Sequence, residues 1–219
     1  RYDEASRSFQ EALEGFRARA AKGFTDAVAR AETIEMNLGA VLVLQGELEE
    51  ARPLLESAVE AMRSNPESAE NLDQVLVNLG RLEFASGDFP AALLAFEEAT
   101  TVARRRFGRE HVRSAAAGHE LGQLNFQLVR YAEAIPILEE VLATRRRLLG
   151  PTAATTLQTG LYLPLAHLKT GDLDAAIATR DRVDSDFLAA GDEIGPNRLQ
   201  MLYFFMQFAN ELGTVAGER

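Results

Sequence analysis

The chain repeats itself at an interval of about 42 residues, and this periodicity restricts its fold more than any other feature. The stretch NLGRLEFASGDFPAALLAFEEA, residues 78–99, has counterparts that begin at Asn37, Glu120 and Tyr162, at offsets of 41, 42 and 42 residues. A period of this length is typical of stacked supersecondary units, each too small to bury its own apolar face. The sequence therefore predicts an array of similar units.

The aligned copies carry small or apolar residues at equivalent positions. We expect the small residues to lie where two helices come close together, because a large side chain there would push the helices apart. In the four copies the equivalent positions are Gly39, Gly80, Gly122 and Pro164; Gly46, Gly87, Val129 and Gly171; Leu48, Phe89, Tyr131 and Leu173; and Ala51, Ala92, Ala134 and Ala176. We expect Phe89 and Phe96 to fill the space between the helices.

Each copy contains the pattern of two amphipathic helices joined by a short turn. In the second copy, apolar residues recur at spacings of three and four between Leu72 and Leu82, and again from Phe89 onwards. The intervening Ser-Gly-Asp interrupts both patterns. Gly87 is suited to end the first helix, and Asp88 is suited to cap the start of the second.

The periodicity divides the chain into four complete repeats and two partial ones. We predict the second helix of a partial repeat at 1–22, complete repeats at 23–64, 65–108, 109–150 and 151–191, and the first helix of a further repeat at 192–219. Because its first residues match the second half of a repeat, we expect the chain to be a fragment of a longer protein. Exposed partial repeats could also allow end-to-end self-association.

One proline conflicts with the helical pattern. Pro164 stands in the middle of a predicted helix, where the other copies have glycine. Proline has no N–H to donate to the carbonyl of Gly160, and its ring crowds the preceding turn. We therefore predict a kink in this helix.

The repeated Leu-Gly and Gly-x-(Tyr/Phe/Leu)-x-x-Ala pattern resembles that of the tetratricopeptide repeat (TPR) family, and the resemblance covers nearly the whole chain. The usual TPR period is about 34 residues. The longer period here is similar to that of the kinesin light chain subgroup, as are the linker FGREH at 107–111 and the Ala-x-Pro sequences at 51–53 and 134–136. The resemblance implies an all-α fold, a right-handed α-solenoid of helix-turn-helix units.

The resemblance also implies a protein-interaction scaffold in which the first helix of every repeat lines a concave groove for a peptide or helix of a partner protein. The residues expected to line this groove are Asn37, Asn78, Arg81, Phe84, His119, Glu120, Gln123, Tyr162, Lys169 and Tyr203. The amide side chains of Asn37 and Asn78 both donate and accept, which suits an extended peptide backbone. Two interpretations of these asparagines remain open: they bind a peptide, or they form hydrogen bonds within the array.

Composition and motifs argue against several other functions. A formal net charge of −10 disfavours binding to nucleic acid or to anionic membranes. The chain has no cysteine, which fits a cytoplasmic location. We find no metal-site motif, phosphate-binding loop or nucleophile motif, so we expect no enzyme activity, no cofactor and no metal. The alternatives are the regulatory or sensor region of a larger signalling enzyme, protease or transcription regulator, and a stand-alone hydrolase with a composite site.

Two arginine runs, at 104–106 and 145–147, are the most prominent local charges. They could hold an acidic partner or a phosphate group. Both runs end a predicted second helix, where cations offset the negative end of the helix dipole. We therefore interpret them as structural.

Overall fold

The computed structural model describes residues 2–64, 69–191, 203–204 and 206–213, and all the regular elements among them are helices. This confirms the predicted all-α repeat fold; the right-handed sense of the array stays a prediction. The elements are α1 (Tyr2–Ala20), α2 (Thr25–Gln45), α3 (Leu48–Ser64), the short 3₁₀ helix η1 (Ala69–Asn71), α4 (Leu72–Ala85), α5 (Phe89–Phe107), α6 (Val112–Gln127), α7 (Tyr131–Leu149), α8 (Ala154–Gly160), α9 (Tyr162–Lys169) and α10 (Leu173–Ala190). Residues 203–204 and 206–213 are also helical.

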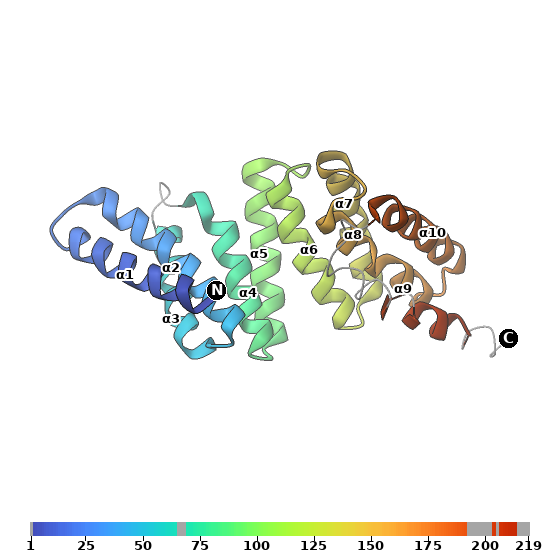
Figure 1. The fold of residues 1–219 in the computed structure, drawn as a ribbon, viewed down its shortest axis with the longest axis horizontal. Helices are drawn as coiled ribbons and strands as arrows, with labels where there is room; N and C mark the ends of the chain where they lie inside the picture. The colour runs from blue at the N-terminus through green and yellow to red at the C-terminus, as the bar shows by residue number, and fades with distance from the viewer. Residues whose placement is uncertain (1, 65–68, 192–202, 205, 214–219) are drawn as a thin grey trace. The chain divides into compact units, whose positions relative to one another are not determined.

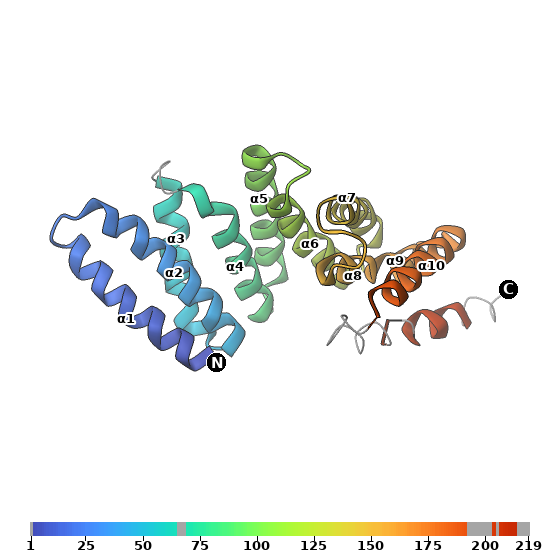
Figure 2. The same cartoon turned by 45° about the horizontal axis from the view of Figure 1, so that its top comes forward.

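The chain consists of two compact units, Arg1–Arg106 and Phe107–Arg219. In the first unit α1 packs beside α2, α2 beside α3, and α3 beside α4 (Figures 1 and 2). Helix α2 also contacts α4, so the first helices of consecutive repeats lie next to each other. Each helix thus buries its apolar stripe against a helix of its own repeat and one of the neighbouring repeat.

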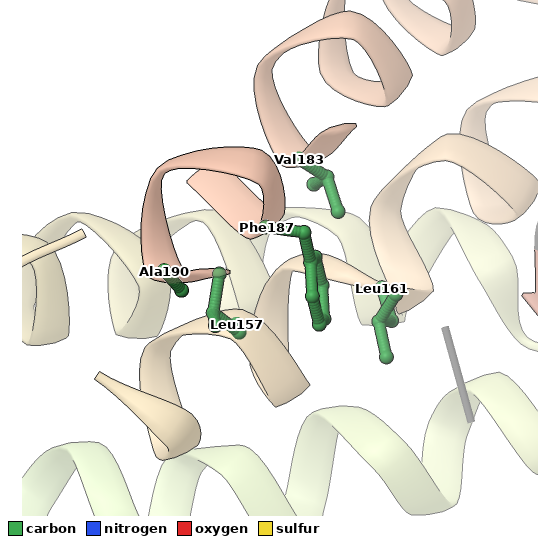
Figure 3. Packing of buried hydrophobic residues seen from close by; sticks show 5 residues of the cluster. All are labelled: Leu157, Leu161, Val183, Phe187 and Ala190. Atoms are coloured by element: carbon green, nitrogen blue, oxygen red, sulfur yellow. The ribbon is translucent and has the colours of Figure 1, made fainter. Parts of the chain in front are cut away.

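In the second unit α6 packs on α7, and α7 packs on both α8 and α9. Helix α10 covers α8 and α9, and a buried apolar cluster joins α10 to α8 and Leu161. Figure 3 shows this cluster, in which the ring of Phe187 from α10 lies between Leu157 and Leu161. The last predicted partial repeat begins at 192–202, and these residues lie outside the described ones.

The repeated glycine of the first helix is the place where a side chain of the second helix docks. A methyl group on Gly80 would lie 2.5 Å from the Phe96 ring, and one on Gly39 or Gly122 would lie 2.7 Å from a leucine side chain. The glycine therefore makes room for a large side chain of the partner helix. The expected close approach of the two helices at this glycine is confirmed. The space that the glycine leaves is filled by an apolar side chain of the second helix.

The expectation for Phe89 was wrong. The sequence predicts that Phe89 fills the space between helices, but 40% of its surface is exposed. Its ring lies 5.6 Å from that of Phe84, at the end of the pair where the turn reaches solvent. Phe96, two turns further along α5, is buried and fills the interhelical space instead.

The turns within the repeats share one hydrogen-bond pattern. Gly87 adopts φ +82°, its N–H donates to Phe84 O, and Asp88 N–H donates to Glu83 O. The Asp88 carboxylate then accepts from Ala91 N–H at 3.0 Å, which confirms the predicted helix end and cap. Gly46 and Gly171 adopt the same left-handed conformation at φ +83° and +85°.

Val129 takes the place of that glycine in the third copy and keeps the turn. It has φ +63°, and the N–H groups of Val129 and Arg130 make the equivalent bonds to Phe126 O and Asn125 O. A β-branched residue is strained in this conformation because its Cβ approaches the following carbonyl. The side chain is 68% exposed, so it gains little from burial. The repeat fold imposes this turn against the local preference of the residue.

Pro164 interrupts the first helix of the fourth copy, as predicted. The helix is divided into α8 and α9, with Leu161 as the residue between them. The break falls one turn before the proline, next to the Gly160 carbonyl that a residue with an N–H would have bonded. Pro164 and its neighbours Leu163 and Leu165 are buried. The break between α8 and α9 therefore lies in the buried interior of the second unit.

We predict that Gly80→Ala destabilises the protein. The added methyl group must displace the buried Phe96 ring, so the free energy of unfolding should fall by about 1–2 kcal/mol. Gly15→Ala is the matched control, because Gly15 also lies within a helix and has nothing within 4 Å of an added Cβ. It should raise stability by about 0.5–1 kcal/mol. Urea titration followed by circular dichroism measures both, and a Gly80→Ala protein as stable as the parent would contradict the docking model.

We also predict that Val129→Gly stabilises the protein. Glycine removes the left-handed strain, so the free energy of unfolding should rise by about 0.5–1.5 kcal/mol, less the entropy that glycine gains on unfolding. The reciprocal variant Gly87→Val should lose stability by a similar amount. Thermal and urea unfolding of both variants provide the measurement; a change of the same sign in both would refute the strain argument.

Candidate functional site

Two of the predicted partner-binding residues of the first unit, Asn37 and Asn78, lie on the side of α2 and α4 that faces away from their own second helices. Gly39 and Gly80 point at the second helix of their repeat. Asn37 and Asn78 stand two positions earlier, a rotation of about 200° around the helix. Since α2 contacts α4, the structure brings these two asparagines onto adjacent helices at equivalent repeat positions.

The amide groups of Asn37 and Asn78 are half-buried. Within the described part of the chain, neither side chain makes a hydrogen bond. An amide that is partly desolvated and unbonded has unused donors and an unused acceptor. Of the two interpretations of these asparagines, hydrogen bonding within the array is therefore not seen among the described residues.

Arg81 and Phe84 follow Asn78 along α4, and both are exposed. Phe84 has 38% of its surface accessible, and its ring is supported by Phe89. Helix α4 thus presents the amide of Asn78, the cation of Arg81 and, on the side nearer α5, the aromatic ring of Phe84. This combination offers polar, charged and apolar contacts to a partner from one helix.

The corresponding residues of the second unit lie on α6, α9 and the last described helical segment. Glu120 and Gln123 are half-buried on α6. The Lys169 ammonium group on α9 forms an ion pair with Glu211 at 2.6 Å. Tyr203 is 55% exposed, and its hydroxyl accepts a hydrogen bond from Gln207 Nε2 at 2.7 Å. Through the ion pair of Lys169 with Glu211, α9 thus contacts the helical segment that follows α10.

His119 and Tyr162 differ from the expectation, because both are buried. Only 5% of His119 and 4% of Tyr162 is exposed, so neither side chain can meet a partner at the surface of this structure. His119 lies against Thr159 of α8, and Tyr162 packs on Phe126 of α6 and on Phe204, so both side chains face neighbouring helices of the same unit. We therefore treat them as the support beneath Glu120 and not as contact residues.

Beneath Glu120, a buried arginine ties α7 to α8. Arg145 Nη1 donates to Thr159 Oγ1 at 2.6 Å and to the Thr155 carbonyl at 2.8 Å. His119 Nδ1 lies 3.4 Å from the same Thr159 hydroxyl. Burial lowers the pKa of Arg145, and the negative charge of Glu120 acts in the opposite direction. The hydrogen bonds offset the cost of removing this cation from water.

The sequence analysis interpreted Arg145 as structural, through the helix dipole, and missed its buried hydrogen bonds. A signal was present, since Arg145 follows Leu138 and Leu142 at spacings of seven and three residues, on the buried stripe of α7. A cation on an apolar stripe is expected either to reach solvent or to find buried acceptors. Here it finds acceptors, at positions on α8 that local sequence alone does not reveal.

Tyr162 lies at the centre of an aromatic group. Its ring is 5.3 Å from those of Phe126 and Phe204, in edge-to-face contact with both. Burial raises the pKa of Tyr162 to about 12, and the charge of Glu120 adds to the effect. The phenol is therefore held in its neutral form, and this group joins α6, α9 and the segment containing Phe204.

The described residues lack two kinds of functional feature. They contain no cluster of three or more His, Cys, Asp or Glu side chains that could hold a metal ion. No helix in the same residues combines the length and the apolar character needed to cross a membrane.

Comparison with known proteins identifies the repeat. Two family models described as tetratricopeptide repeat match residues 30–105 and 114–152. A search of curated protein sequences finds no significant match.

Solved structures resemble the chain at low sequence identity. BtubC (BKLC) from P. vanneervenii superposes with a TM-score of 0.77 at 19% identity, covering 97% of this chain and 84% of that one. Repeats of a Podosopora anserina protein described as a kinesin light chain give a TM-score of 0.71 at 21% identity, covering 85% of this chain and 88% of that one. The apo form of RapI gives 0.72 at 14% identity, covering 99% of this chain and 61% of that one. These similarities are similarities of fold.

We predict that Tyr162 makes stability depend on pH in the alkaline range. Its pKa is about 12 in the folded protein and about 10 in an unfolded chain, so the folded state keeps a proton that the unfolded state loses. The contribution of Tyr162 to stability is complete below pH 10. It is lost as the pH rises towards 12, which lowers the free energy of unfolding by up to about 2 kcal/mol. The measurement is the difference in unfolding free energy between the parent and Tyr162→Phe from pH 9 to about pH 12. Parallel pH profiles would show that the phenol does not titrate as described.

Proposed function

Because the chain belongs to the tetratricopeptide repeat family, we propose that it binds a protein partner by holding a peptide or helix against the exposed side of its first helices. Tetratricopeptide repeats serve as protein-interaction scaffolds and are generally not catalytic. Their repeated surfaces offer many weak contacts along an extended ligand. In this chain the proposed binding surface consists of the exposed and half-buried predicted residues of the first helices.

The pair of unbonded amides on α2 and α4 is the observation that carries the proposal. Asn37 and Asn78 are separated by one repeat and occupy adjacent helices. A peptide backbone presents an N–H and a carbonyl at every residue, and a side-chain amide can pair with both. Half-buried amides lose part of their hydration in the free protein, so bonding to a peptide costs them less than it would cost fully exposed groups.

Charged and aromatic residues of the first helices define the rest of the proposed surface. In the first unit, Arg81 and Phe84 would contact the side chains of the ligand. In the second unit Glu120, Gln123 and Tyr203 remain accessible, while Lys169 is partly neutralised by Glu211. The first unit thus offers Arg81 and the second offers Glu120, so each unit is proposed to contact a ligand group of the opposite charge.

We predict that Asn37→Ala combined with Asn78→Ala weakens binding of a peptide selected against the full chain from a display library. Losing two amide contacts should lower the affinity about 10- to 100-fold, since each hydrogen bond contributes about 0.5–1.5 kcal/mol. Isothermal titration calorimetry gives the affinity, and circular dichroism confirms that the helices are retained. Selected peptides that bind the parent and the double variant equally would place the binding surface elsewhere.

Arg81→Glu tests the charged part of the same surface. It should weaken binding of a selected peptide that carries an acidic residue, by about three- to tenfold. The matched control is Arg105→Glu, which makes the same charge change on α5 at another exposed position. If both variants lose affinity equally, the effect reflects the overall charge of the protein and not this surface.

A further inference from the structure

The second unit contains a cavity between two second helices, away from the residues of the proposed partner surface. A cavity of about 580 Å³ opens between α7 and α10, above α8 and the start of α9. Its volume is within the range of pockets that take small organic ligands. We call it the α7–α10 cavity. It contains none of the residues assigned to the proposed partner surface.

The inner wall of the α7–α10 cavity is apolar. Leu142 comes from α7, Leu157 and Leu163 from α8 and α9, and Val183 from α10. Leu157 and Val183 also belong to the buried cluster shown in Figure 3, so this wall rests on packed core. Gly160 lies in the floor, where a side chain would narrow the cavity. A hydrocarbon body placed here would remove apolar surface from water on both partners.

Some of the charged residues at the mouth of the cavity have an ion-pair partner, and one arginine has none within the described ranges. Arg146 pairs with Asp186 across the cavity, and Arg147 pairs with Glu110 at 2.8 Å. Glu139 lies 3.6 Å from His167 Nε2. Arg182 is exposed and forms no ion pair with any residue in the described ranges. One guanidinium at the mouth is therefore available to an anion.

A buried hydroxyl in the lining has no partner. Thr156 is 1% exposed and lines the cavity, and its Oγ1 makes no hydrogen bond within the described part of the chain. An unsatisfied buried hydroxyl is costly. Rotation about its Cα–Cβ bond exchanges the hydroxyl and methyl positions, which would let a polar atom of a ligand satisfy it.

We propose that the α7–α10 cavity binds a small organic anion with a linear apolar body and a single carboxylate. The apolar wall holds the body, Arg182 pairs with the carboxylate, and Thr156 supplies a further hydrogen-bonding group. A neutral apolar molecule would leave Arg182 unused. A cation would meet the guanidinium groups of Arg146, Arg147 and Arg182, which outnumber the carboxylates of Glu139 and Asp186 in the lining.

The equivalent place in the first unit provides an internal comparison. A cavity of about 430 Å³ lies between α1 and α3 there, and Leu13, Arg17 and Leu38 hold the register positions of Leu142, Arg146 and Leu163. Its charged lining residues are Glu14, Glu50 and Arg17, and Arg17 is paired with Glu35 at 2.7 Å. That cavity has no unpaired cation in its lining, so the proposed anion preference belongs to the second unit.

The proposal is tested with octanoate and its neutral counterpart 1-octanol, titrated into the full chain by calorimetry. We expect saturable binding of octanoate at one site and at least fivefold weaker binding of 1-octanol. Arg182→Gln should reduce octanoate affinity about fivefold and remove the preference for the anion. Absence of octanoate binding, or equal affinity for both ligands, would overturn the proposal.

A cavity-filling pair of variants locates the site. Ala143 lines the cavity and is exposed, whereas Ala132 is exposed on the same helix outside it. Ala143→Phe should abolish octanoate binding, and Ala132→Phe should leave it unchanged, with the helical content of both retained by circular dichroism. Octanoate binding that survives Ala143→Phe would show that the ligand binds elsewhere. Peptide binding at the first-helix surface should be unaffected by Ala143→Phe, which separates this test from that of the proposed function.

Discussion

The packing of one large side chain onto one glycine holds the helix pairs of the first three complete repeats together. Phe96 over Gly80, Leu55 over Gly39 and Leu138 over Gly122 are the same contact at successive positions of the repeat. The glycine gives up intrinsic helix stability so that the two helix axes can approach, and burial of the aromatic or aliphatic side chain offsets this loss. Once this contact sets the pair, the side of the first helix two residues away must face outwards, and the amides of Asn37 and Asn78 lie on that side.

Contacts between repeats differ from those within them, since many are ionic. Arg52 on α3 forms a two-pronged pair with Glu83 on α4, at 2.6 and 2.9 Å. Arg63 reaches Glu98 on the second helix of the next repeat. The hydrogen bond with Glu83 raises the pKa of Arg52, and the buried part of Glu83 would be left without a partner if Arg52 were removed. Exposed pairs of this kind add little stability, whereas breaking a pair with a buried partner is costly.

The sequence predicted the helices, the turns and the break at Pro164 because these depend on spacing and on backbone chemistry. Gly87 and Asp88 act within a few residues of themselves, so their roles can be read locally. Tyr162 and His119 could not be placed in the same way. Whether a helical residue faces a groove or a neighbouring helix depends on the rotation of the helix against its partners, and an error of one position turns it by about 100°. Arg145 was missed because its acceptors lie on another helix.

The division of one first helix into α8 and α9 has a consequence for how the second unit holds itself together. Segments of seven and eight residues are too short to persist as helices alone. Packing against α7 and α10 stabilises both segments as helices. The helical conformation of both segments therefore depends on α7 and α10, and Leu161, which keeps a helical backbone conformation between them, is held by the same packing against α10.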